Sequence, residues 1–237
     1  MVSERLRHRF YPDSRRDGTA AFYGWVRQHT DAETRMLNLG AGPPTRAPLR
    51  IFKGEVARVV GADIDPLVLD NDELDDAVVI RDGRLELPDG DFDVVLSDFT
   101  FEHVEHPVEF LVEARRVLRP GGSLFFRTPN RRHYVATISR LTPHWFHALV
   151  ANRARKLAAD AHEPWPTFYR LNCEADIDRA ARAAGFQQLE LRMFEAEPSY
   201  LVFATVPFLA GVAYERLTNR FPSLSRLRGS IFGRLLA

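Results

Sequence analysis

The chain has 237 residues, the size of one large domain, and 45% of them are apolar and 27% charged. These fractions exclude a disordered chain. Lys and Arg total 32, as do Asp and Glu, so a nucleic-acid binder that depends on an overall basic surface is excluded as well. The single cysteine, Cys173, excludes an internal disulfide and a cysteine-rich zinc site. We therefore expect a reducing, cytoplasmic location, and no secretory signal in the arginine-rich first residues.

The first 30 residues are expected to form a helical segment, with a helix from about 14 to 28. From residue 31 onward, apolar runs of strand length alternate with helical or loop segments. The predicted strands are 36–39, 57–62, 77–80, 92–96 and 123–127. The clearest predicted helix is 107–118, whose apolar residues follow a 3.6-residue period. This alternation predicts an α/β fold with a parallel sheet covered on both faces.

The last third of the chain follows a different pattern. Helices are expected at about 145–159 and 174–184, within and after a helical insertion at about 131–172. Two apolar runs, 188–194 and 200–206, are separated by five residues, which is too short for a parallel crossover. They are therefore predicted to be an antiparallel pair that ends the domain at residue 206.

The C-terminal tail, 207–237, is expected to be helical, with a break near Pro222. Its apolar residues from Leu224 to Leu236 follow one helical stripe, and it carries five arginines against one acid. A basic amphipathic helix of this kind suits the surface of an anionic membrane. The same stripe also suits a helix docked on the domain or on a second subunit of a homodimer, and both interpretations stay open.

A strand that runs directly into a glycine turn is the strongest functional signal. The sequence MLNLGAG places Asn38, Gly40, Ala41 and Gly42 at the carboxyl edge of the sheet, where ligands of open α/β sheets bind. Asp63 ends the next predicted strand, 21 residues after Gly42. A carboxylate at this spacing can accept hydrogen bonds from both ribose hydroxyls.

Two further features indicate the kind of nucleoside. Asp82 follows the third predicted strand and is a candidate acceptor for an adenine amino group, with an exposed turn residue as the alternative. After Gly42 the chain continues with Pro43 and Pro44, and proline has no N–H to offer a phosphate. A cofactor without a pyrophosphate therefore suits this turn.

Together these stretches resemble the class I S-adenosylmethionine-dependent methyltransferases, in the branch with small-molecule enzymes of quinone and natural-product biosynthesis. The matching stretches, in the order and spacing of the family, are MLNLGAG, VVGADID, RDGRLELPDGDFDVVLSDFTFEHVEHP and EARRVLRPGGSLFFRTPNRRHY. They cover residues 36–134, and a weaker similarity continues to residue 186. Asn38 stands where the family usually has an acid, and Pro43-Pro44 replaces a third glycine.

The resemblance implies a Rossmann-like, seven-stranded sheet of order 3-2-1-4-5-7-6, with strand 7 antiparallel and helices on both faces. It implies S-adenosylmethionine as cofactor. No metal is expected, because a single loop that offers His103 and His106 without a distant partner falls short of a metal site. The residues implied to contact the cofactor's methionine part, ribose, adenine and mouth are Asn38, Gly40, Ala41, Gly42, Asp63, Ile64, Asp82, Gly83, Ser97 and Phe99.

A hydroxyl acceptor would need a general base, and the candidates follow the fourth predicted strand. We favour His103, with Asp98 or Glu102 as the acid that orients it; a histidine that packs within the domain is the alternative. Substrate-covering side chains are expected after the fifth strand, among them His133 and Tyr134.

The sequence thus predicts methyl transfer to a small-molecule, lipid or sugar acceptor, and no nucleic-acid partner. One alternative is a nicotinamide-dependent oxidoreductase or epimerase. The missing third glycine and the antiparallel pair of strands argue against it. The other is a non-catalytic relative that retains the cofactor fold.

Overall fold

The computed structural model describes residues 2–136 and 165–237, which fall into two compact units. The sheet unit consists of residues 22–129, 167–192 and 231–237. The helical unit consists of the described parts of 1–21, 130–166 and 193–230.

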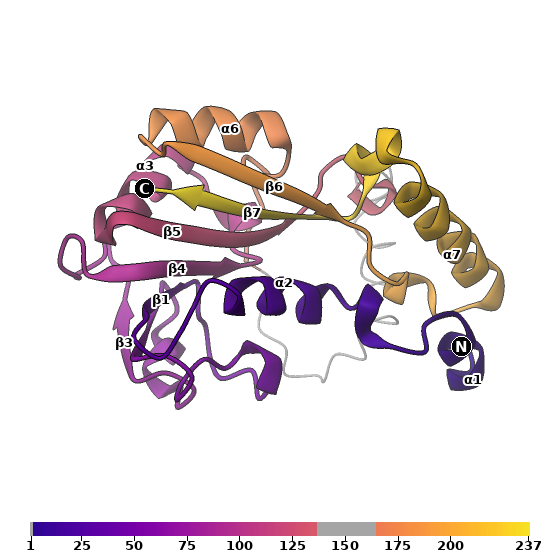
Figure 1. Ribbon diagram of the computed structural model, residues 1–237, viewed down its shortest axis with the longest axis horizontal. Helices are drawn as coiled ribbons and strands as arrows, with labels where there is room; N and C mark the ends of the chain where they lie inside the picture. The colour runs from indigo at the N-terminus through magenta and orange to yellow at the C-terminus, as the bar shows by residue number, and fades with distance from the viewer. Residues whose placement is uncertain (1, 137–164) are drawn as a thin grey trace. The chain divides into compact units, whose positions relative to one another are not determined.

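The sheet unit is built on seven strands in the order β3-β2-β1-β4-β5-β7-β6, with β7 antiparallel to the rest (Figure 1). The strands are β1 Arg35–Leu39, β2 Arg58–Asp63, β3 Asp76–Val79, β4 Phe92–Asp98, β5 Leu118–Pro129, β6 Gln188–Phe194 and β7 Ser230–Leu236. β1 pairs in parallel with β2 on one side and β4 on the other. The strand order therefore reverses at β1, where open α/β sheets bind ligands. The predicted fold class and sheet order are confirmed.

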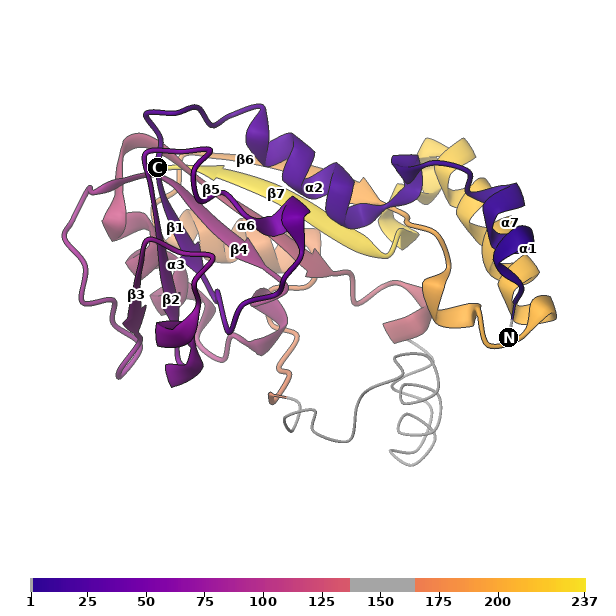
Figure 2. The same ribbon diagram turned by 90° about the horizontal axis from the view of Figure 1, so that it is seen from below.

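Helices cover both faces of this sheet. α3 (Pro107–Val117) and α6 (Glu174–Ala183) lie on one face and α2 (Gly18–Arg27) on the other, as Figures 1 and 2 show. Successive side chains of a strand point to opposite faces, and β5 supplies both layers. The Phe125 ring packs edge-on against Trp25 of α2, with centroids 5.2 Å apart, and the Phe126 ring stacks on Phe101 at 4.3 Å.

The five predicted parallel strands and the helices at 107–118 and 174–184 are confirmed, with boundaries shifted by at most two residues except in β5, which begins five residues before the predicted start. The predicted helix at 145–159 lies outside the described residues. The connection from β1 to β2 contains no α-helix, only the 3₁₀ turn η2 (Pro48–Arg50). Three prolines in this connection, Pro43, Pro44 and Pro48, each lack the N–H that a helix interior requires.

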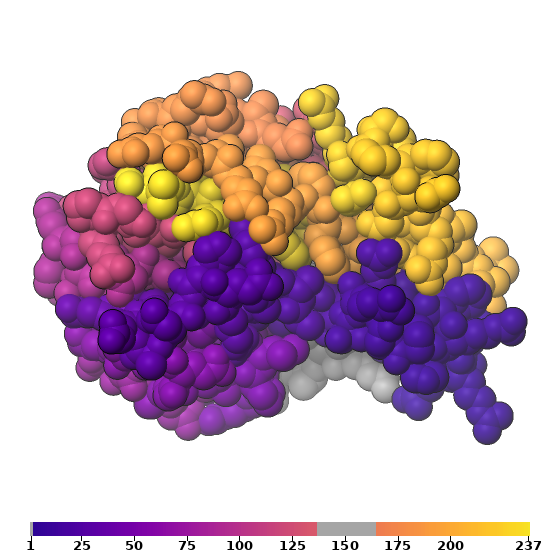
Figure 3. All heavy atoms as spheres, viewed as in Figure 1, coloured from indigo at the N-terminus to yellow at the C-terminus, as the bar shows by residue number. Residues whose placement is uncertain are grey.

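The predicted second strand of the antiparallel pair, 200–206, is wrong. This stretch begins in the 3₁₀ turn η5 (Ser199–Leu201) and leads into α7 (Thr205–Arg220), and Val206 is 78% exposed. The antiparallel strand is instead β7, at the end of the chain. In Figure 3 the yellow atoms of β7 lie between the orange atoms of β6 and the magenta atoms of β5.

The predicted helical stripe from Leu224 to Leu236 is also wrong. Residues 222–227 form the 3₁₀ helix η6 (Pro222–Leu227), and Ile231, Phe232 and Leu235 are at most 3% exposed in β7. A strand between two others needs apolar residues on both faces, which over seven residues resembles a helical spacing. The amphipathic helix on which a membrane-surface role depended is therefore absent. Within the described ranges, no helix has the length and apolar character needed to cross a membrane.

The helical unit has a small core of its own. Tyr11, Phe208 and Val212 form it, and the aromatic ring of Phe10 packs against Phe208 at its edge. Phe208 and Val212 belong to α7, whereas Phe10 ends α1 (Glu4–Phe10). α1 and α7 therefore pack on each other within this unit, as Figure 2 shows.

Leu235→Ala tests the position of β7. Leu235 is fully buried, so the substitution should lower the free energy of unfolding by about 2–5 kcal/mol, through lost apolar burial and a residual cavity. Leu227→Ala is the matched control, because Leu227 is 39% exposed, and it should change stability by less than about 0.5 kcal/mol. Urea denaturation measures both. Equal, small effects would contradict a buried C-terminal strand.

Candidate functional site

The glycine turn after β1 is held against the end of β2. Gly40 and Gly42 have φ angles of 85° and 57°, which side-chain-bearing residues rarely adopt. The Gly40 amide donates to the Ala62 carbonyl at 2.7 Å, and the Ala41 amide reaches the same oxygen at 3.3 Å. A Cβ atom at position 40 would overlap the side chain of Thr100. Glycine at this position therefore lets the turn approach its neighbours closely.

The Asp63 carboxylate completes this turn. Its Oδ2 accepts a hydrogen bond from the Gly42 amide at 2.8 Å, and its Oδ1 accepts one from the Asp65 amide at 2.9 Å. The Asn71 side chain donates to the Gly42 carbonyl at 2.9 Å. Each carboxylate oxygen has a second lone pair, so Asp63 can still accept from two neighbouring hydroxyls, as a ribose presents them. Ile64 follows it and is 56% exposed.

Asp82 and Gly83 form an exposed turn after β3. Both have positive φ angles, 53° and 72°, and the isolated bridge between Arg81 and Arg84 closes the turn around them. The Asp82 carboxylate is exposed to solvent. The arrangement fits both of the roles considered for it, a contact to an adenine and a surface turn.

Ser97 and Phe99 differ from each other in their surroundings. Ser97 is fully buried, and its hydroxyl has no hydrogen-bond partner within the described residues. Because side chains alternate along β4, Ser97 points away from the face that carries Asp98. Phe99 has a φ angle of 56°, and its ring lies 4.4 Å from the guanidinium carbon of Arg127. The structure therefore brings the glycine turn and Asp63 together but leaves the Ser97 hydroxyl inside the sheet.

Asp98 takes part in a buried ion pair. Arg127, opposite it on β5, donates through Nε to Oδ1 at 2.6 Å and through Nη2 to Oδ2 at 2.7 Å. The Tyr23 hydroxyl donates to Oδ2 at 3.1 Å. The Asp98 side chain is 7% exposed and that of Arg127 is 3% exposed. A carboxylate neutralised in this way is poorly suited to removing a proton, so Asp98 fits a positioning role.

Sequence reasoning did not single out Arg127 or Tyr23. The signal for Arg127 was a charged residue inside the otherwise apolar run SLFFRT, in register with Asp98 on the neighbouring strand. A charge in such a run is rarely tolerated without a partner. Tyr23 carries no such signal, because aromatic residues on a predicted helix normally indicate core packing.

A cavity adjoins the glycine turn. The end of β1 contributes Asn38 and the turn contributes Gly40 and Ala41, while Tyr23, Arg50 and Asp98 add polar groups from three other segments. Further lining residues are Met36, Thr45, Phe52, Val59, Asn71, Glu73, Leu74 and Leu96. Three of the four residues predicted for the cofactor's methionine part, Asn38, Gly40 and Ala41, therefore line a cavity with aromatic and charged walls, whereas Gly42 does not line it.

Glu102 and His103 lie in the short turn after β4, η4 (Phe101–His103). The Glu102 side chain accepts a hydrogen bond from the Thr128 hydroxyl at 3.3 Å, and the Asn172 amide donates to the same hydroxyl at 2.7 Å. Glu102 is 7% exposed, and this burial raises the pKa of its carboxyl. His103 is half-buried, and its backbone amide donates to Thr100. The predicted base therefore directly follows an acid whose burial makes it hold its proton to a higher pH than usual.

His133 pairs with an acid that the sequence did not reveal. Its Nε2 lies 3.2 Å from Glu195 Oε1, and Glu195 Oε2 accepts from the Gly229 amide at 2.6 Å. The ring of Tyr214 packs against His133 at 5.5 Å. Burial and the negative charge of Glu195 raise the pKa of Tyr214 to about 12. His133 and Glu195 are both less than 9% exposed, so they link segments within the helical unit.

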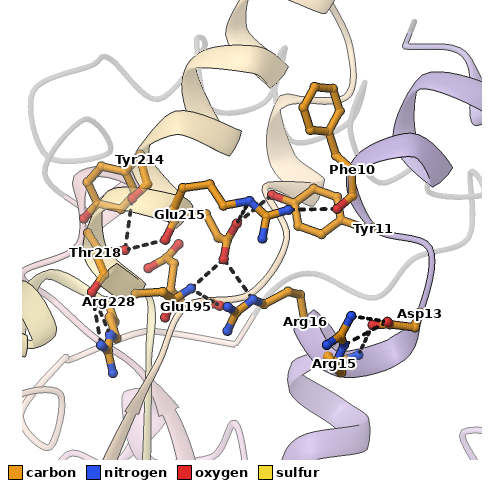
Figure 4. A network of polar contacts seen from close by, with 12 residues as sticks. Phe10, Tyr11, Asp13, Arg15, Arg16, Glu195, Tyr214, Glu215, Thr218 and Arg228 are labelled. Atoms are coloured by element: carbon orange, nitrogen blue, oxygen red, sulfur yellow. Dashed lines mark hydrogen bonds and ion pairs between the residues drawn. The ribbon is translucent and has the colours of Figure 1, made fainter. Parts of the chain in front are cut away.

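A second buried acid, Glu215, has several donors around it (Figure 4). The Tyr11 hydroxyl donates to Oε2 at 3.2 Å, while Arg16 Nε at 2.9 Å and Asn219 Nδ2 at 2.6 Å reach Oε1. Arg216 Nε lies 3.4 Å from Oε2. Glu215 is fully buried and saturated by these contacts, which indicates a structural role. Of the described residues, no three His, Cys, Asp or Glu are grouped so that they could hold a metal ion.

Comparison with known proteins identifies the sheet unit. Residues 37–126 match a family described as methyltransferase domain. By this match and by its sheet order, this part of the chain is similar to the class I S-adenosylmethionine-dependent methyltransferases. A protein of Mycolicibacterium smegmatis named "Probable S-adenosylmethionine-dependent methyltransferase" is 34% identical over 121 residues, and demethylmenaquinone methyltransferase of Tropheryma whipplei is 35% identical over 119 residues.

These alignments cover only part of this chain and of its relatives. The two alignments cover 45% and 46% of this chain and 46% and 48% of the relatives, so the chain spans about half of the length of the curated relatives it matches. A chain from the complex between the Haloferax volcanii Trm112 methyltransferase activator and a methyltransferase is 19% identical, with a TM-score of 0.58; the match covers 99% of this chain and 95% of that chain. The latter similarity shows a shared fold alone.

Glu102→Gln tests the buried acid of the methyltransferase domain. Between the ordinary pKa of 4.5 and its raised value, the folded state holds a proton that the unfolded state has lost, so stability falls as the pH rises through this window. The glutamine variant should lack this loss. Its free energy of unfolding, relative to that of the natural protein, should therefore increase as the pH rises above the ordinary pKa of 4.5, as urea titrations at a series of pH values measure.

Glu105→Gln is the control for this measurement, because the Glu105 side chain is 51% exposed. It should leave the pH dependence of stability as it is. If Glu102→Gln also leaves the pH dependence of stability unchanged, the pKa of Glu102 is not raised in the folded state.

Proposed function

We propose that this protein transfers the methyl group of S-adenosylmethionine to a small-molecule acceptor. The observation that carries this proposal is the Asp63 carboxylate, hydrogen-bonded to the glycine turn through Gly42 and retaining acceptor capacity on both oxygens. A nucleoside that carries an amino-acid group needs two acceptor oxygens for its ribose hydroxyls and a backbone that it can approach closely. Asp63 provides the acceptor oxygens, and the glycine turn provides such a backbone beside a cavity. The methyltransferase domain supports this assignment.

The residues present fit this cofactor better than a nicotinamide dinucleotide. A pyrophosphate is normally bound by the N–H groups of a helix that starts at the glycine turn. Here the β1–β2 connection has no α-helix, and Pro43 and Pro44 have no N–H to donate. The contacts we propose for the cofactor are the methionine part at Asn38, Gly40, Ala41 and Gly42, the ribose at Asp63 and Ile64, and the adenine at Asp82 and Gly83, with Phe99 at the mouth.

When bound, the cofactor supplies an electrophilic methyl group on a sulfonium centre. The chain then has to orient the acceptor and remove its proton. We propose His103 as the base for a hydroxyl acceptor, because it is half-buried and follows the fourth strand at the ligand edge of the sheet. Asp98 holds Arg127 and Tyr23 in place, so it acts by positioning.

The acceptor class follows from the relatives. One of them is named a demethylmenaquinone methyltransferase, and we propose an acceptor of comparable chemistry, a small hydroxylated or quinol-type ring or a lipid that carries one. A cytoplasmic location and a homodimer also remain predictions. Gel filtration with light scattering measures the oligomeric state. No contact of the tail with a membrane is proposed, because residues 230–236 form β7.

Asp63→Asn tests the ribose contact. The substitution removes the negative charge and one acceptor oxygen, so it should weaken binding of S-adenosylmethionine and of its demethylated product by about 1.5–3 kcal/mol. Isothermal titration calorimetry measures both affinities. Asp70→Asn, at the exposed end of the turn that follows β2, is the matched control and should bind normally. Binding of NAD in place of S-adenosylmethionine by the natural protein would favour the oxidoreductase alternative.

His103→Ala tests the base. With a phenol or quinol acceptor that supports turnover, it should lower kcat by about 10²–10⁴-fold, because the acceptor proton has no group to receive it. Affinity for the cofactor should stay unchanged. His106→Ala is the control on the same loop, since the His106 side chain is 70% exposed. A loss of thermal stability with little change in kcat would instead support a packing role for His103.

A further inference from the structure

The β1–β2 connection presents a cation to the cavity beside the glycine turn. Arg50 ends the 3₁₀ turn η2, and its side chain lines the same cavity as Asn38, Gly40 and Ala41. It is 35% exposed, so it is reachable from solvent but partly surrounded by protein. Electrostatic attraction at such a place is screened less than on an open surface.

The carboxylate nearest to Arg50 is already neutralised. Arg50 Nη1 lies 3.9 Å from Asp98 Oδ2, which is beyond hydrogen-bond distance. Asp98 accepts two hydrogen bonds from Arg127, at 2.6 and 2.7 Å, and a third from Tyr23. Arg50 thus shares one carboxylate with Arg127, and the two guanidinium groups and Asp98 together carry a net positive charge.

Glu73, the other acid that lines the cavity, is also engaged. Its Oε1 accepts from the Arg46 amide at 2.6 Å, and its Oε2 accepts from the Thr45 amide at 3.0 Å. These contacts hold the first part of the connection. Both acids that line the cavity are thus bound by other groups of the protein. Arg50 is the basic residue of the cavity lining.

The backbone around Arg50 is fixed from outside. Arg27 of α2 donates to the carbonyl of Leu49 at 2.9 Å and to that of Ile51 at 3.0 Å, one residue on each side of Arg50. The same arginine pairs with Glu55 at 2.7 Å. A guanidinium held on a fixed backbone loses less freedom when it binds, which favours affinity.

The connection also lacks the usual source of positive charge. A helix that starts at a glycine turn offers free N–H groups and roughly half a positive charge to an anion. No such helix follows β1, and Pro43 and Pro44 remove two further donors. An arginine supplies a full charge and a planar pair of donors that matches a carboxylate.

We propose that Arg50 binds the carboxylate of the amino-acid part of S-adenosylmethionine, in place of a helix N-terminus. This inference rests on the proposed function, since it assumes that the adenosyl cofactor occupies the glycine turn. It assigns the binding of that carboxylate to a residue of the β1–β2 connection, which lies between the stretches MLNLGAG and VVGADID.

The test compares three adenosyl ligands on the full chain by calorimetry. S-adenosylhomocysteine carries the carboxylate, its decarboxylated counterpart keeps only the amine, and 5′-methylthioadenosine lacks both. Arg50→Gln should raise the Kd of S-adenosylhomocysteine by about 10- to 100-fold, the equivalent of a lost charged hydrogen bond. It should leave the Kd of the other two ligands unchanged. Arg50→Lys should fall in between, because lysine keeps the charge but not the paired donors.

Arg46→Gln is the matched control, since Arg46 lies on the same connection, pairs with Asp72 and is 69% exposed in its side chain. It should bind all three ligands normally. Equal affinity of Arg50→Gln and the natural protein for S-adenosylhomocysteine would overturn the inference and leave the cofactor assignment standing. An equal loss for all three ligands would also overturn it, because that indicates a damaged nucleoside site. Failure of the natural protein to bind any of them would overturn the proposed function as well.

Discussion

The hydrogen bond from the Gly42 amide to Asp63 ties the end of β1 to the end of β2, at the place where the strand order of the sheet reverses. The glycine turn depends on it, because a chain with φ angles of 85° and 57° needs contacts that hold it. The Ala62 carbonyl accepts from Gly40 and Ala41, and the Asn71 amide donates to Gly42. The shape of the candidate site is thus set by backbone and carboxylate contacts between two parallel strands.

Charge is used in the interior of the methyltransferase domain mainly to position other groups. Asp98 and Arg127 form a buried, two-point ion pair, and the Arg127 guanidinium carbon lies within about 6 Å of the ring centroids of Phe22, Tyr23 and Phe99. Removal of one partner of such a pair leaves an uncompensated charge, which typically costs about 3–5 kcal/mol. The pair therefore constrains the cavity wall beside the glycine turn. For this reason we propose a positioning role for Asp98 and proton transfer by His103.

The β1–β2 connection replaces a regular helix by side-chain contacts. Lys53 Nζ donates to the Leu74 carbonyl at 2.5 Å, the Tyr23 and Phe52 rings stack at 5.9 Å, and Arg27 binds the carbonyls around Arg50. These contacts order a proline-containing segment that has only one 3₁₀ turn of its own. They give the cavity a wall and place a cation in it. A helix would have offered main-chain donors instead.

The sequence by itself determined the parallel part of the sheet and the glycine turn with its carboxylate, because both depend on local patterns. These patterns are the apolar runs for β1 to β5, and Gly40, Gly42 and Asp63 at fixed spacing. Only the tertiary structure decided which C-terminal segment becomes the antiparallel strand. The runs 200–206 and 230–236 are both short and apolar, and a run of this length fits a strand and a helix equally well. What distinguishes them is long-range: Gly233 of β7 lies where a Cβ atom would overlap the Phe126 ring, and Ile231 and Leu235 are fully buried. The partners of Asp98 and the place of Arg50 were equally hidden, since each depends on contacts between segments that are far apart in the sequence.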